Sequence, residues 1–181
     1  MTPPNVFQQG SRPVLLAISI AGMSLVCLGA SQAIAANNDL VSARPDHSFL
    51  SVRMPGTVEY DEAVRDTALG DVEHHTASAI SGELELSITA SVLPGFVSSL
   101  SADNMLYRKA RRELLDNYSG ETKAWSSCSH AGYACRDLGY SIDDGRHGMA
   151  RLYIDGEVMV VVNAIYEDDE DAARRFLDSV Q

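Results

Sequence analysis

The stretch C-S-H-A-G-Y-A-C, residues 128–135, holds the residue types in this chain most suited to chemistry. Two cysteines enclose a histidine, so thiol redox exchange, metal ligation and disulfide formation are all open. A redox pair needs C-x-x-C at the start of a helix, where the dipole lowers a thiol pKa, and this spacing is longer. A metal site would recruit His130 with both thiolates, but no fourth ligand follows at a recognised spacing. The pattern favours a Cys128–Cys135 disulfide over the other two chemistries.

The N-terminal segment bears on this choice, because disulfides persist in oxidising compartments. An apolar run of small residues precedes Ala33 and Ala35, which fit the small-x-small pattern that signal peptidase reads. We therefore predict that residues 1–35 are a signal peptide, cleaved between Ala35 and Ala36, and that the mature protein is periplasmic or secreted. Cleavage would also remove Cys27 and leave a single possible cysteine pair.

The alternative is that this segment is retained in a membrane. No charged residue lies between Arg12 and Asp39, so residues 13–38 could span about 30 Å of hydrocarbon and anchor the protein. A lipid anchor at Cys27 fits poorly, because the cysteine follows Val26 and a lipobox has a small residue there. Membrane association is expected only if the segment is not removed.

The other residues that could take part in catalysis or metal binding are better explained by structural roles. His74 and His75 are neighbours in a predicted strand, so their side chains point to opposite faces and cannot both bind one ion. We interpret them as surface histidines. No G-x-S-x-G nucleophile elbow is present, and the run at 143–145 lacks the rest of a calcium loop. We predict no catalytic residue, no metal site and no cofactor.

The charge of the chain limits its partners. Lys and Arg number 14 against 25 Asp and Glu, and the resulting net charge of −11 repels phosphate backbones, which excludes nucleic acid. Against this background Arg108, Lys109 and Arg112 form a basic group on one predicted helix. They are either a solvated helix face or a docking patch for an anionic partner.

Hydrophobic periodicity indicates the elements that must position these residues. Alternating apolar residues bounded by turn signals predict strands near 50–54, 57–66, 71–80, 83–92, 121–128, 133–142, 148–154 and 157–166. In the clearest of them the side chains predicted to face inward are Leu84, Leu86, Ile88, Ala90 and Val92. Helical spacing predicts helices over about 103–118 and 170–180. Residues 36–47 are polar and are predicted to be a flexible lead-in to a single domain over 48–181.

Three motifs resemble the PsbP-like fold group. They are F-L-S-V-R-M-P-G at 49–56, R-L-Y-I-D-G-E-V-M-V at 151–160 and R-F-L-D-S-V at 175–180. The group includes a photosystem extrinsic subunit, a Ran-binding nuclear-transport factor and many uncharacterised secreted bacterial proteins. The resemblance implies an α+β fold, an α/β/α-type sandwich around a mainly antiparallel sheet, and a binding or assembly role without catalytic residues. A disulfide at Cys128 and Cys135 is not general in that group.

Two function classes remain at this stage. The first is an exported, non-enzymatic module that binds a protein or small-molecule partner through one sheet face or the basic helix. The second is a small periplasmic hydrolase or thiol-dependent enzyme whose site is assembled from scattered residues. A concave pocket with a histidine or carboxylate beside a nucleophile would favour the enzyme, and its absence would favour the binding module.

Overall fold

The computed structural model describes residues 40–67, 70–95 and 103–181. The predicted signal peptide and its cleavage position at Ala35 and Ala36 lie outside these ranges, so export stays a prediction. Within the described ranges, no helix combines the length and the apolar character needed to cross a membrane.

A seven-stranded antiparallel sheet forms the centre of the fold, with the strand order β3-β4-β5-β9-β8-β7-β6. Its strands are β3 (Glu59–Thr67), β4 (Gly70–Ser81), β5 (Leu84–Val92), β6 (Gly120–His130), β7 (Tyr133–Ile142), β8 (His147–Asp155) and β9 (Val158–Tyr166). A separate antiparallel pair joins β1 (Leu40–Ala43) to β2 (Val52–Pro55). The nearly continuous apolar run of β9 suits its position in the middle of the sheet, where both faces are covered.

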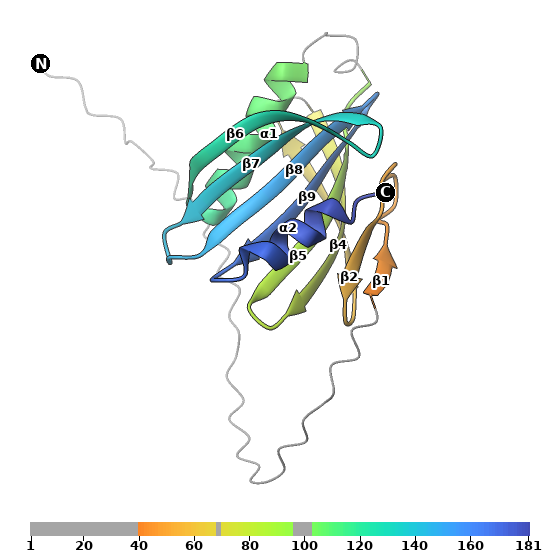
Figure 1. Ribbon diagram of the computed structural model, residues 1–181. Coiled ribbons are helices and arrows are strands. Elements are labelled where there is room, and N and C mark those ends of the chain that lie inside the picture. Colours follow the sequence, from red (N-terminus) through yellow and green to blue (C-terminus); the bar gives the residue numbers. More distant parts are fainter. Residues whose placement is uncertain (1–39, 68–69, 96–102) are drawn as a thin grey trace, which may run out of the picture. The chain divides into compact units, whose positions relative to one another are not determined.

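Two helices lie on opposite faces of this sheet. Figure 1 shows α2 (Glu170–Asp178) and the β1–β2 pair on one side and α1 (Asp103–Tyr118) on the other. Asp169 caps the N-terminus of α2 by accepting a hydrogen bond from the Ala172 N–H at 2.8 Å. The predicted sandwich around a mainly antiparallel sheet is therefore confirmed.

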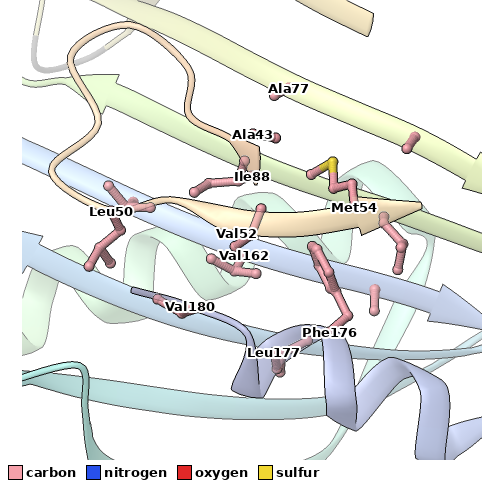
Figure 2. Packing of buried hydrophobic residues seen from close by; sticks show 14 of the residues in the cluster. Ala43, Leu50, Val52, Met54, Ala77, Ile88, Val162, Phe176, Leu177 and Val180 are labelled. Carbon is pink, nitrogen blue, oxygen red and sulfur yellow. The ribbon is translucent and has the colours of Figure 1, made fainter. Parts of the chain in front are cut away.

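The two faces carry two hydrophobic cores. Figure 2 shows the first, in which Phe176 and Leu177 of α2 meet Met54 of β2, Ile88 of β5 and Val162 of β9. The second core lies under α1 and consists of Val72, Leu93, Leu106, Tyr107, Ala110, Leu138, Tyr140, Ile142, Ala150, Leu152, Met159 and Ile165. Successive residues of one strand enter different cores, as the two-residue period of a strand requires.

The predicted facing of the strand at 83–92 is confirmed for Leu84, Leu86, Ile88 and Ala90, whereas Val92 is half-buried and belongs to neither core. Leu86, Ile88 and Ala90 are buried in the first core, and the partly buried Leu84 packs against it. Their polar neighbours therefore point to the α1 side of the sheet.

The prediction of a flexible lead-in is wrong for residues 40–47. Residues 40–43 form β1, and Ala43 pairs with Val52 and is completely buried in the first core. The following turn is held by the buried Ser48, whose hydroxyl bonds both the N–H and the carbonyl of Leu50. This four-residue strand, Leu-Val-Ser-Ala, escaped prediction because it is too short to show alternation and only Ala43 is buried. The folded domain therefore extends back at least to Leu40.

Candidate functional site

A groove of about 400 Å³ opens between the sheet and α1. Side chains from β3, β4, β5, β9 and α1 line it, and the buried residues of α1 pack beside it on Leu138, Tyr140 and Leu152 of β7 and β8. The helix thus covers one half of this sheet face, and the groove lies over the other half.

The floor of the groove is a set of polar cross-strand pairs. His74 of β4 lies opposite Ser91 of β5, and its Nδ1 is 2.9 Å from the Ser91 hydroxyl. The hydroxyls of Thr76 and Thr89 form the next pair, also 2.9 Å apart. Such pairs contribute roughly 0.2–1 kcal/mol each to sheet stability. A sheet face beside a packed helix is normally apolar, so this hydroxyl row needs an explanation other than packing.

These groups keep unused hydrogen-bonding capacity toward the groove. A hydroxyl offers one donor and two acceptors, so the Thr76–Thr89 bond occupies only part of what the two side chains can make. Ser87 continues the row on β5 and lies opposite Asn163 of β9, which also lines the groove. Donors and acceptors from three adjacent strands therefore face one space.

A buried tyrosine, Tyr140, orients Asn163 in the lining of the groove. The Tyr140 hydroxyl donates to Asn163 Oδ1 at 2.8 Å, and Asn163 is only 3 % exposed. Burial raises the pKa of Tyr140 far above its ordinary value and also raises the pKa of Tyr118, which lines the groove. Both phenols are therefore neutral hydroxyl groups at pH 7, and Asn163 is held in one orientation.

The electrostatics of the groove are acidic. Among the described residues, Asp61, Asp66, Glu113 and Asp116 line it against the single cation Arg65. Burial lowers the pKa of His74, and the positive charge of Arg65 lowers it further, so this imidazole is neutral at pH 7. Four carboxylates against one guanidinium favour a cationic or uncharged polar ligand over an anion.

The His74–Ser91 contact places a histidine beside a hydroxyl, which is the feature expected of the enzyme class. However, Ser91 is only 2 % exposed and lies within a regular strand, paired on both sides with His74 and Met159. Backbone N–H groups used in such a ladder are not free to stabilise an oxyanion. The geometry therefore suits a hydrogen-bonded floor better than an activated nucleophile.

The cysteine pair lies away from this groove. Cys128 of β6 is directly opposite Cys135 of β7, their Cα atoms are 4.8 Å apart, and their sulfur atoms are at bonding distance. The structure supports the predicted pairing. The histidine between them, His130, points its Nε2 to the Val180 carbonyl at 3.3 Å instead of joining the sulfurs in a metal site.

Of the three residues in the predicted basic patch on α1, two are exposed and the third is paired with a carboxylate. Arg108 and Arg112 are exposed, whereas the ammonium group of Lys109 lies 3.5 Å from the carboxylate of Glu113. The sequence interpretation did not include Arg111, whose guanidinium lies 5.1 Å from the Trp125 ring centre. Docking of an anionic partner at Arg108, Lys109 and Arg112 stays a prediction.

Comparison with known proteins identifies the class of fold. No family model matches the chain, and no curated protein matches it. Among solved structures, the chain is similar to cyanobacterial PsbP (CyanoP) from Synechocystis sp. PCC 6803, with a TM-score of 0.53 and 14% identity over 85% of this chain and 98% of that one. A protein of unknown function, PA94 from Pseudomonas aeruginosa, covers 77% of this chain and 94% of its own at 10% identity, with a TM-score of 0.36.

The fold is therefore PsbP-like, as the three motifs implied. At 14% identity the similarity shows the architecture and carries no residue roles. The groove residues were not predicted from the sequence, although the serines and threonines at alternate positions of 83–92 were a usable signal.

Proposed function

We propose that this protein is an exported, non-enzymatic binding module whose groove beside α1 takes a small polar ligand bearing amine or hydroxyl groups. The observation that carries the proposal is the row of His74, Thr76, Ser87, Thr89 and Asn163, which points hydrogen-bonding groups into an acidic groove. Ligand sites commonly combine a preformed concave surface with a few fixed polar groups.

Binding should be tested with probes of different charge. Putrescine and spermidine represent cations, glycerol an uncharged polyol and citrate an anion, each measured by calorimetric titration and by the shift in melting temperature. We expect the amines to bind more tightly than citrate, and their affinity to fall with added salt. Equal or tighter binding of citrate would contradict the charge argument.

A matched pair of variants locates the site. Thr89→Val removes a groove hydroxyl with little change in shape, and Thr122→Val makes the same change on the exposed strand β6. We expect at least a threefold loss of amine affinity in Thr89→Val, corresponding to about 0.7 kcal/mol for one neutral hydrogen bond, and no loss in Thr122→Val. Equal affinities in the two variants would place the binding elsewhere.

Export is supported by the disulfide pairing of Cys128 and Cys135 and by the signal-like N-terminal sequence. The proposed mature protein begins at Ala36. Intact-mass measurement of protein purified from the cell envelope tests this, and retention of residues 1–35 would favour the membrane anchor over residues 13–38.

A second candidate function is a hydrolase, and one contact favours it: the 2.9 Å approach of His74 to Ser91. A fluorophosphonate probe distinguishes the two functions, because it labels activated serines. The binding proposal expects no adduct by intact mass. An adduct that disappears in Ser91→Ala would replace it with the hydrolase.

A further inference from the structure

The opposite side of strand β4 carries a second cluster of chemically active side chains. His75 points to the face that holds α2 and the β1–β2 pair, where it meets His47 from the β1–β2 connection. Their ring centres are 4.8 Å apart. Glu73 lies two residues from His75 on the same face of β4, and Glu62 of β3 lies directly opposite His75.

The unusual member of this cluster is His75. Its side chain is only 12 % exposed, and neither ring nitrogen has a hydrogen-bond partner among the described residues although both are buried. A buried polar atom without a partner costs roughly 1–3 kcal/mol, so such atoms normally have an explanation. Carboxylates flank both nitrogens without bonding them: Glu62 lies 3.5 Å from Nδ1 and Glu73 lies 3.9 Å from Nε2.

The donor atoms are already close enough for a metal ion to draw together. The donors of His47, Glu73 and His75 all lie within 4.8 Å of one another, and so do those of Asp46, Glu62 and His75. A tetrahedral Zn²⁺ with bonds of about 2.0–2.2 Å holds its donors roughly 3.3–3.6 Å apart. The remaining movement of about 1 Å falls on the side chains of His47 and Glu73, both of which are exposed.

We propose that His47, Glu73 and the Nε2 of His75 bind a late first-row divalent cation, with Zn²⁺ as the type ion. Two imidazoles and a carboxylate form a nitrogen–oxygen set that suits Zn²⁺ or Cu²⁺ better than Ca²⁺ or Mg²⁺. Glu62 then accepts a hydrogen bond from the Nδ1–H of His75, which fixes the tautomer that presents Nε2 to the ion. Histidine ligands of metals usually donate their other ring N–H to a carboxylate, a backbone carbonyl or a water.

The connection that carries His47 is built to hold its position. The Ser48 N–H donates to the Pro45 carbonyl at 3.2 Å and closes a turn, in which His47 has a left-handed φ of +61°. Glycine adopts this conformation most readily, and histidine is among the few other residues that adopt it, at a conformational cost. Asp46 and His47 also border an open hollow of about 390 Å³, which gives an ion a path from solvent.

The test is calorimetric titration of ZnCl₂ into the purified full-length protein after chelator treatment and desalting. We expect one Zn²⁺ per chain, binding at least 10-fold weaker in His75→Gln, and about 10-fold weaker in Glu62→Gln as an outer partner. The matched control is His74→Gln, the adjacent residue that faces the other side of the sheet and should leave Zn²⁺ affinity unchanged. Excess CaCl₂ should not displace the Zn²⁺.

Two further measurements guard against misfolded variants. Glu73→Gln alters a side chain that is 56% exposed, so this variant should fold like the wild type and still lose at least 10-fold in Zn²⁺ affinity. Co²⁺ binding should give visible d–d absorption bands that disappear in His75→Gln. The absence of stoichiometric Zn²⁺ binding to the wild type, or equal affinities in the His74→Gln and His75→Gln variants, would overturn the proposal.

Discussion

Removal of the Cys128–Cys135 disulfide gives a quantitative test of the export argument. The two cysteines are seven positions apart in the chain and occupy opposite sites in the β6–β7 hairpin. On the chain-entropy model, a cross-link closing a loop of about eight residues stabilises the native state by roughly 2.5 kcal/mol at 25 °C. For a domain of this size that corresponds to about 5–10 °C in melting temperature.

The measurement compares thermal melts, followed by circular dichroism, of oxidised wild type, reduced wild type and the Cys128→Ala, Cys135→Ala double variant. Alanine is preferred to serine because Cys135 is only 1 % exposed and a serine hydroxyl would be buried there. We expect the reduced protein to melt about 5–10 °C below the oxidised protein and still fold. The backbone pairing of β6 with β7 runs from Gly120 to His130, and we expect it to hold the hairpin together without the cross-link.

The reductant must have no effect on the double variant, which serves as its control. If native oxidised protein shows two titratable thiols and reduction leaves the midpoint unchanged, the disulfide is absent and the argument for an oxidising compartment loses its structural support.

The remaining predictions concern single residues. Gly148→Ala should destabilise the fold by about 3 kcal/mol in urea titration, because an ideal Cβ would lie 2.0 Å from the ring of Tyr140; a loss below 1 kcal/mol would contradict the close packing. Arg151→Met should cost about 1.5–3 kcal/mol, since its guanidinium joins Asp137 to the Leu177 carbonyl at the end of α2; unchanged stability would mean that this clamp contributes nothing. The lowered folded-state pKa of His74 means that its contribution to stability is present above pH 6.5 and is lost as pH falls through the folded value. His74→Gln should therefore lose less stability than wild type on acidification, and parallel pH profiles would refute this.

Hydrophobic periodicity predicted most of the fold, because strands and helices each bury apolar residues at a characteristic spacing in the sequence. Apolar alternation predicted strands at 148–154 and 157–166, and the structure pairs them as β8 and β9, from Asp155 opposite Val158 to His147 opposite Tyr166. Cys128 and Cys135 fall in the strands predicted at 121–128 and 133–142, and the structure places them opposite each other on β6 and β7. These inferences needed only contacts between residues close in the chain.

The groove depends on information that no local pattern contains. The alternation in 83–92 predicted only that its polar residues face away from the apolar ones, yet Ser91 is only 2 % exposed. How far α1 extends over the sheet decides whether such residues meet water, a helix or an enclosed groove. That coverage is set by packing between distant segments, such as Leu106 and Ala110 in one core with Leu138 and Leu152.

The two histidines of β4 show how a correct rule can support an incomplete conclusion. Their alternation does exclude a shared ion, since His74 contacts Ser91 and His75 faces His47 on the other side. The conclusion that both are ordinary surface residues did not follow, because each face has its own neighbours. His47 is 28 positions away from His75 and lies in a segment interpreted as flexible, so no local pattern pairs the two residues.

Strand β4 therefore contributes residues to both proposed sites. Thr76 contributes to the groove floor, and His75, the adjacent residue, is the centre of the proposed metal site on the opposite face. The partner strand β3 is divided in the same way, with Asp61 lining the groove and Glu62 beside His75. β3 is an edge strand of the sheet and is hydrogen-bonded to β4 alone. The side of the groove formed by β3 therefore has fewer backbone hydrogen bonds to hold it than the floor formed by β4, β5 and β9. An ion joining β4 to His47 would add a restraint to this edge from outside the sheet, where the backbone ladder cannot supply one.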